Sequence, residues 1–299
     1  MMARALCECG FSVEETGDYY THMVRNDFSV FNPTKTLSVN PYFTRDWAVQ
    51  RWGMAALNWA TPLPIHNRVE NVYIENGQLV LRQEAYPQEN VLTSNNVSVA
   101  SIASREGHFL HGSFRTEFKL QGASGGSVAG FFWYHNDKNE IDVEILAREF
   151  KDDSMLVHYT IHPALDEKGR LIRNSTEIIS LEGDHPANHF QTHRFDWTKN
   201  EVRFYQNSEL VHSISKRVPK VSGNVYLNLW ADGGMWSGAP STTDVFLRVK
   251  TITIFHNTTM SDEGKDELFE LRCQKAGGRS GSTVCIDGDI ESGRIPSSK

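Results

Sequence analysis

Three acidic residues at every second position, Glu140, Asp142 and Glu144 in the segment NEIDVE, are the best candidates in this chain for chemistry. In an extended strand successive side chains point to opposite faces, so the three acids share one face and the aliphatic residues between them share the other. Carboxyl groups crowded in this way repel each other and lose hydration, which raises their pKa values. Such a cluster can supply a nucleophile and a general acid to the same bond.

Cleavage of a glycosidic bond with retention is a reaction that needs two carboxyl groups, about 5 to 5.5 Å apart. Residues i and i+4 on a flat strand are about 13 Å apart at Cα. The side chains of Glu140 and Glu144 must therefore converge. Two long glutamates on a curved, twisted strand can lean together with the shorter Asp142 between them.

The spacing alone decides nothing, because Asp287, Asp289 and Glu291 in DGDIE repeat it. With 37 acidic residues in 299, roughly half a match is expected by chance. DGDIE lies in a stretch rich in Gly, Ser and charge, which predicts a loop or a disordered tail without function. Deleting residues 280–299 should then spare activity if Cys285 is unpaired or its bridge is dispensable. NEIDVE instead follows SVAGFFWYHNDK, a run typical of a buried strand. Acids in such a strand are costly and call for a functional explanation.

Composition excludes several classes of protein. A chain of 299 residues that is 39% hydrophobic is long enough for one large all-β domain or two ordinary ones. The net charge of −7 and a pI near 5.9 argue against a nucleic-acid partner. There is no apolar run of about 18 residues, so we expect no membrane span. We expect a monomer.

The sequence has features that favour two different cellular compartments. The start MMARALCECG lacks the apolar core of a signal peptide, which favours a cytosolic protein with reduced thiols. Asn96, Asn174 and Asn257 fit the N-glycosylation pattern, and the four cysteines (Cys7, Cys9, Cys273 and Cys285) lie near the chain ends. That placement suits disulfide staples better than a zinc site. We favour secretion.

Residues from about 20 to 260 read as a succession of short strands separated by turns. Asn76-Gly77 between two β-rich runs is a strong hairpin signal, and residues 206–208 form a second turn. Further strand candidates are HGSFRTEFKL, SVAGFFWY, SMLVHYTIH, THRFDW, GNVYLNLW and DVFLRVKTITIF. Many short strands without intervening helices predict an all-β antiparallel sandwich or barrel. We divide the chain into an N-terminal segment (1–19), a sandwich (20–260) and a C-terminal helix and polar tail (261–299).

The segment SDEGKDELFELRCQK is the one long helical candidate. Ser261 or Asp262 is predicted as its N-cap, and Leu268, Phe269 and Leu271 as the face that docks on the sandwich.

The block HGSFRTEFKLQGASGGSVAGFFWYHNDKNEIDVEIL resembles the core of glycoside hydrolase family 16, the laminarinase and lichenase group with the signature Glu-Ile-Asp-x-Glu. NHFQTHRFDWTKNEVRFYQNSELVHSI and GNVYLNLWADGGMWSG resemble later blocks of that family, in the same order. CECG and WSGAPSTTD are similar to fungal members. The resemblance implies a concanavalin-like β-jelly-roll of two curved antiparallel sheets. It places a glucan-binding cleft, with NEIDVE, on the concave face.

The resemblance also implies residue roles. Glu140 would be the nucleophile, Glu144 the acid/base, and Asp142 would hold and tune the nucleophile. Crowding should keep Glu144 protonated while Glu140 is ionised. Strand parity places Phe132 and Tyr134 on the acids' face, with core packing as the alternative. The remaining substrate-binding candidates are His158, Thr160, His162, Asn228, Trp230 and Trp236.

The chain departs from the family pattern at a few positions. Asn139 and Lys138 stand where lichenase-like members usually carry Asp and often Trp, which affects substrate positioning rather than the three acids. Lys250 stands where some members have a calcium-binding Asp, so we predict no metal there, and no cofactor.

Two functions remain in competition. The favoured one is a retaining endo-β-glycosidase that cleaves polysaccharide, with transglycosylation on the same residues as a variant. The alternative is a jelly-roll that no longer hydrolyses sugar, either a carbohydrate-binding module or a fold repurposed for a small-molecule reaction in the cytosol. Intact acids favour the enzyme, because a lectin gains little from holding three repelling carboxyl groups together. The missing signal peptide favours the alternative.

Overall fold

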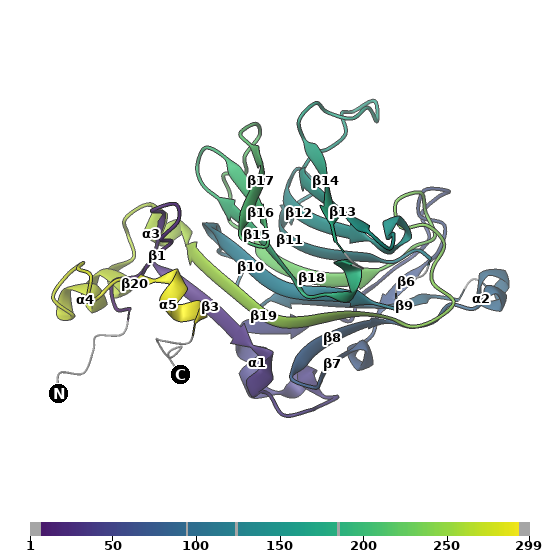
Figure 1. Ribbon diagram of the computed structural model, residues 1–299, viewed down its shortest axis with the longest axis horizontal. Coiled ribbons are helices and arrows are strands. Elements are labelled where there is room, and N and C mark those ends of the chain that lie inside the picture. The colour runs from purple at the N-terminus through teal and green to yellow at the C-terminus, as the bar shows by residue number, and fades with distance from the viewer. Residues whose placement is uncertain (1–6, 94, 123–124, 184–185, 293–299) are drawn as a thin grey trace.

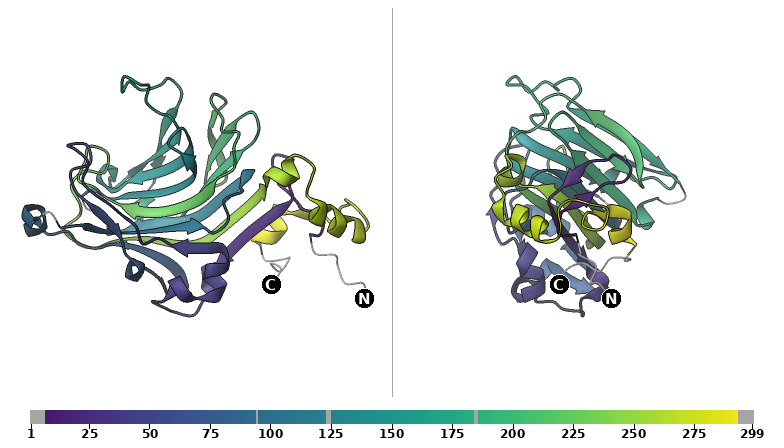
Figure 2. Two further views of the ribbon diagram at one scale, coloured as in Figure 1. Left: turned by 180° about the vertical axis from the view of Figure 1, so that it is seen from behind. Right: turned by 90° about the vertical axis from the view of Figure 1, so that its left-hand side faces the viewer.

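The computed structural model describes residues 7–93, 95–122, 125–183 and 186–292. Two large β-sheets pack face to face, and their long strands are curved (Figures 1 and 2). The predicted all-β sandwich is confirmed. No helix in these ranges is long and apolar enough to cross a membrane.

The site sheet is the sheet that contains NEIDVE, on strand β12. Its order is β14 (Thr176–Glu182), β13 (Ser154–Ile161), β12 (Asn139–Leu146), β11 (Val128–Asn136), β18 (Asn224–Trp230), β9 (Val97–Ser104), β6 (Ile65–Asn67) and β5 (Gly53–Met54), with β4 (Trp47–Val49) also paired to β9. Neighbouring strands are antiparallel except β6 and β9, which are parallel. β12 therefore has a hydrogen-bonded neighbour on each side, β11 and β13.

The back sheet forms the second layer. Its order is β17 (Glu209–Ile214), β16 (Val202–Gln206), β15 (Gln191–Trp197), β10 (Leu110–Gln121), β19 (Val245–Asn257), β8 (Gln78–Gln83) and β7 (Val72–Glu75), and β3 (His22–Asp27) pairs with β19. The predicted hairpins are confirmed. Asn76 and Gly77 join β7 to β8 with positive φ at both turn residues, as a two-residue turn of this hand requires, and Asn207 and Ser208 do the same between β16 and β17.

The core lies between the two sheets and is built by alternation along the strands. Phe131 and Trp133 of β11 point inward, with the aliphatic residues of β12, and are fully buried. They meet aromatic rings of the back sheet: Trp133 lies 4.4 Å from Trp197 and Phe131 lies 5.4 Å from Phe195, between ring centroids. This layer fixes the inner face of β11 and β12, so the acids must lie on the opposite face.

Short helices occupy the connections and the chain ends. The α-helices are α1 (Pro41–Asp46), α2 (Gln88–Thr93), α3 (Thr259–Asp262), α4 (Glu267–Lys275) and α5 (Asp287–Glu291); the 3-10 turns are η1 (Phe28–Val30), η2 (Leu37–Val39), η3 (Val69–Asn71), η4 (Ala147–Glu149) and η5 (Pro186–Asn188). A small sheet of β2 (Tyr19–Tyr20), β1 (Phe11–Ser12) and β20 (Cys285–Ile286) joins the two ends of the chain. With α4 and α5 it forms a cap at one end of the sandwich (Figure 1).

Disulfides hold this cap together. Cys7 is bonded to Cys285 and Cys9 to Cys273, so the prediction of terminal staples is confirmed. The predicted loop or disordered tail at DGDIE is wrong, because these residues form α5 on the outer face of the back sheet. The disulfide brings them to Arg115, a buried cation of β10 that needs counter-charges.

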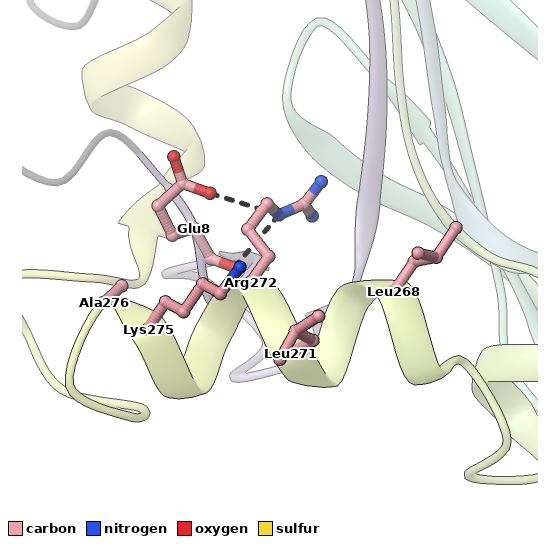
Figure 3. A pocket seen from close by; sticks show the side chains of 6 residues that line it. All are labelled: Glu8, Leu268, Leu271, Arg272, Lys275 and Ala276. Carbon is pink, nitrogen blue, oxygen red and sulfur yellow. Dashed lines mark hydrogen bonds and ion pairs between the residues drawn. The ribbon is translucent and has the colours of Figure 1, made fainter.

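The predicted single C-terminal helix is also wrong in detail. Thr258 caps α3 instead of Ser261 or Asp262, and α4 is a separate helix capped by Asp266. Of the predicted docking face only Phe269 is buried. Leu268 is 82% exposed and Leu271 49% exposed, on the face where Arg272 reaches back to Glu8 (Figure 3). The reason is Cys273, which lies four residues after Phe269 on the same side of the helix and is tied to Cys9.

The Arg115 ion pairs give a testable difference in stability. Arg115 Nη1 lies 2.9 Å from Asp287 Oδ2 and 2.7 Å from Glu291 Oε1, and the side chain of Asp287 is 10% exposed while that of Glu291 is 44% exposed. Asp287→Asn should lower the free energy of unfolding by about 1 to 3 kcal/mol, because it weakens a charged bond to a buried group. Glu291→Gln, the matched surface control, should cost under about 1 kcal/mol. Urea denaturation measures both, and equal losses would contradict the assignment.

Candidate active site

The three acids of NEIDVE lie on the face of β12 that points away from the core. Asp142 is 4% exposed, Glu140 and Glu144 are partly exposed, and Ile141, Val143 and Ile145 between and after them are buried in the core. Glu140 and Asp142 can share a proton in a side-chain hydrogen bond, which raises the pKa of Glu140. Strand alternation, read from the sequence, thus places all three carboxyl groups together on the open side of the site sheet.

β11 presents one neighbour to each acid. Tyr134 lies opposite Glu140, Phe132 opposite Asp142 and Gly130 opposite Glu144. Directly opposed residues share a face, so Phe132 and Tyr134 lie on the acids' side, as strand parity predicts. Gly130 leaves room for its neighbour on the other side: a Cβ there would lie 2.6 Å from Asn228 Oδ1, so the Asn228 side chain would have to move.

β13 supplies polar groups on the other side of β12. His158 lies opposite Glu144 and Thr160 opposite Asp142. Just beyond the strand, His162 places Nε2 3.1 Å from Asp142 Oδ2, and its backbone N–H donates to the carbonyl of Glu140. The donor atoms of Glu140, Asp142 and His162 lie within 4.8 Å of one another. Asp142 and His162 contact each other directly, and we assign no metal to the three residues.

Two of the predicted sugar contacts are buried and bonded within the protein. His158 is 3% exposed, and its Nε2 lies 2.6 Å from Glu149 Oε2. Thr160 is 7% exposed, and its hydroxyl shares a 3.1 Å hydrogen bond with Thr176. These side chains support the strand beneath the acids, whereas His162 reaches the acids themselves.

The three remaining predicted residues, Asn228, Trp230 and Trp236, differ in how close they lie to the acids. Trp236, which is 40% exposed, donates its indole N–H to Glu144 Oε2 at 3.1 Å. Asn228 lies across Gly130 from Glu144, in the same row of the sheet. Trp230 lies opposite Val128, one row further along, and packs on a small apolar cluster that includes Ile65. The structure therefore brings Trp236 to the acids and leaves Trp230 beside them.

Sequence reasoning missed several aromatic residues around this site. Tyr226 stacks on Phe132 at 5.0 Å and meets Tyr134 edge-on at 6.1 Å, between centroids. The sequence contained a signal for Tyr226, because it lies two residues before Asn228 and therefore faces the same side of β18. Trp52 and Trp59 are 49% and 76% exposed. The segment that follows Trp59 runs beside the Trp236 loop, where Leu63 N–H donates to the Asp232 carbonyl and Ala60 contacts Gly234.

The environment raises the pKa of every acid in the cluster. Burial raises the pKa of Glu140 to about 9, and the charge of Asp142 adds to the rise. Burial raises the pKa of Glu144 to about 7, helped by Glu140 and opposed by the Trp236 hydrogen bond. Burial and the charge of Glu144 hold the pKa of Asp142 well above its usual range. The expected order of the two glutamate pKa values is thus reversed, because burial and the charge of Asp142 act on Glu140 while the Trp236 hydrogen bond opposes the rise at Glu144.

Comparison with known proteins places this chain in a family. The family model described as glycosyl hydrolases family 16 matches residues 67–246, which is more than half of the chain. The beta-glucanase of Bacillus licheniformis is 28% identical over 121 residues, 38% of this chain and 45% of the relative. The Crh-like protein CRH11 of Candida albicans is 27% identical over 139 residues, 44% of this chain and 28% of the relative. The match thus spans less than half the length of each of these relatives.

A solved structure agrees in fold. The laminarinase from Rhodothermus marinus superposes with a TM-score of 0.57 at 17% identity, over 79% of this chain and 98% of that chain. At this identity the likeness shows the fold alone. Together with the family match, which contains NEIDVE, Gly130, Asn228 and Trp236, it supports a single conclusion: the chain belongs to glycosyl hydrolases family 16.

Proposed function

We propose that the protein is a retaining endo-β-glycosidase that cleaves β-glucan. The observation that carries the proposal is the Glu140–Asp142–Glu144 cluster: three carboxyl groups on the open face of one strand, each with a raised pKa. A pKa of about 7 suits Glu144 for giving up a proton and taking it back near neutral pH. We assign the catalytic unit to residues 20–260 and treat the described residues on either side of it, 7–19 and 261–292, as its cap.

In the first step Glu140 attacks the anomeric carbon while Glu144 protonates the departing glycosidic oxygen. Glu140 must be ionised to attack. In the free protein the hydrogen bond between Glu140 and Asp142 favours the proton on Glu140. Transfer of that proton to Asp142 leaves Glu140 as the charged acceptor. His162, 3.1 Å from Asp142, stabilises negative charge on this pair when it is protonated.

In the second step water attacks the glycosyl-enzyme ester and Glu144 removes its proton. The indole N–H of Trp236 donates to Glu144 Oε2 and so favours the ionised form that this step requires. The same carboxyl group thus acts as acid and then as base.

The aromatic residues beside the acids support a sugar polymer as substrate. Phe132, Tyr226 and Trp236 offer ring faces or edges near the cluster, and Trp52 and Trp59 extend the exposed aromatic surface away from it. Aromatic faces pack against the apolar faces of sugar rings. The names of the compared proteins, a beta-glucanase and a laminarinase, support β-glucan as the class.

We also infer an oxidising compartment, and hence secretion, from the two disulfides that join the chain ends. Asn96 and Asn174, two of the glycosylation candidates, are exposed. The similarity to a Candida albicans protein supports the inference that this is a fungal-type member.

A polysaccharide panel tests the function. We expect new reducing ends and internal cleavage on laminarin or mixed-linkage β-glucan, and little release from chitin, xyloglucan or galactan. Proton NMR of early products should show the β anomer first, as retention requires. The matched control is the Glu140→Gln/Glu144→Gln double variant. Binding without new reducing ends would identify a carbohydrate-binding protein, and products longer than the substrate would identify a transglycosylase.

A further inference from the structure

A short turn directly after the acid strand sends two side chains to different parts of the molecule. η4 begins at Ala147, which is buried and donates its backbone N–H to the Ser127 carbonyl. From this anchored turn Arg148 Nη1 donates to the carbonyl of Met235 at 2.8 Å. The next residue, Glu149, holds His158 at 2.6 Å. Arg148 is exposed, so its bond to the neighbouring loop is a specific contact rather than a consequence of burial.

Both partners contact Trp236. Met235 precedes it in the chain, so Arg148 fixes the backbone next to Trp236. His158 meets the indole edge-on at 5.1 Å between ring centroids, so Glu149 fixes the ring that supports the indole. The indole N–H then donates to Glu144 Oε2 at 3.1 Å. We call Arg148 and Glu149 the η4 clamp.

The charged groups around Glu144 make the position of this indole important. Glu140 and Asp142 lie on the same face of β12, and β11 contributes uncharged Gly130 opposite. His158 faces Glu144 from β13, and His162 lies just beyond that strand. The neighbouring acids oppose ionisation of Glu144, and the Trp236 hydrogen bond and His162 favour it. The Trp236 loop brings to Glu144 a donor that remains in place whatever the charge of the histidines.

We propose that Arg148 and Glu149 are positioning residues for the acid/base: from one turn they hold Trp236 so that its indole N–H orients the Glu144 carboxyl toward the departing oxygen. This inference rests on the proposed function and deepens it. Among the described residues, the hydrogen bonds of the clamp go to Met235 and His158 and none goes to an acid of β12, so its effect passes through His158 and Trp236.

Leaving-group dependence tests the clamp. A poorly activated aryl or alkyl glycoside needs the proton from Glu144, whereas a dinitrophenyl glycoside does not. Arg148→Ala and Glu149→Gln should each lower kcat/KM about ten-fold on the poorly activated substrate and less than about two-fold on the dinitrophenyl glycoside. Trp236→Phe should show the same selectivity, and Arg148→Lys should recover most of the loss. Arg45→Ala, which removes an exposed guanidinium paired with Asp46, is the matched control and should change neither value.

A double-variant cycle and a fluorescence measurement complete the test. If the clamp acts through Trp236, Arg148→Ala/Trp236→Phe should be no worse than Trp236→Phe alone. Equal losses on both substrates, or additive losses, would overturn the proposal. The fluorescence of Trp236 is obtained as the difference between each protein and its Trp236→Phe counterpart. Acrylamide should quench this fluorescence more strongly in both clamp variants than in the native protein. This readout needs no turnover: an inactive native protein would refute the proposed function, and unchanged quenching would refute the clamp.

Discussion

The Glu144→Gln variant should release a burst of aryl alcohol from an activated aryl β-glucoside and then stall. An activated leaving group departs without a proton, so the glycosyl-enzyme still forms, but no base remains to activate water. Turnover of polymer should fall about 10³-fold or more. Azide, a small anion that needs no base, should restore part of the turnover on the aryl substrate and yield a β-glycosyl azide.

Glu140→Gln is the counterpart and should behave differently. Without the nucleophile no covalent intermediate forms, so neither the activated glycoside nor the polymer should turn over, and no burst should appear. A burst from Glu140→Gln in place of Glu144→Gln would reverse the two roles. Undiminished activity in both variants would remove these residues from the mechanism.

Asp142→Asn should lower kcat on β-glucan about 100-fold, because the amide N–H donates to Glu140 and lowers the basicity, and with it the nucleophilicity, of that carboxylate. The same change removes a negative charge that raises the pKa of Glu140. A lower pKa means that Glu140 stays ionised at lower pH, so the acid limb of the kcat/KM profile should move toward lower pH.

The measurement is a pH profile of kcat/KM for the native protein and Asp142→Asn. Asp166→Asn is the control, because its carboxyl group is paired with the exposed Arg170. A fall in kcat with an acid limb that stays in place or moves toward higher pH would contradict the electrostatic role of Asp142.

The parts of this structure that the sequence predicted correctly depend on local chemistry. The face of β12 follows from period-two alternation, and the β7–β8 hairpin from Asn76-Gly77, which tolerates positive φ. Phe132 and Tyr134 were placed on the correct face by parity, since their alternates Phe131 and Trp133 fill the core. Each of these inferences needed only the few residues around it.

The parts that failed depend on contacts between distant residues. DGDIE has the composition of a tail, and it is ordered by a disulfide to Cys7 and by Arg115. The face of α4 that packs inward is determined by the disulfide of Cys273, not by Leu268 or Leu271. His158 has the parity of a cleft residue, but it is buried there by its bond to Glu149 and its contact with the Trp236 indole. No local pattern carries this information.

The predicted order of the pKa values of Glu140 and Glu144 was wrong for a related reason. Their spacing is symmetrical about Asp142, so the sequence offers no basis for deciding which glutamate is more strongly perturbed. The difference arises from burial and the charge of Asp142, which raise the pKa of Glu140, and from Trp236, 92 residues away, whose hydrogen bond lowers that of Glu144.

The two terminal disulfides make the backbone between Cys7 and Cys285 a covalent ring. A single proteolytic cut within that ring, for example at the exposed residues 167–170 of the β13–β14 connection, opens it without separating the parts. The acids of β12 lie before such a cut and Trp236 lies after it, yet both remain on one molecule until a reductant cleaves the disulfides. In an environment rich in proteases the nicked protein is therefore still a single covalent species.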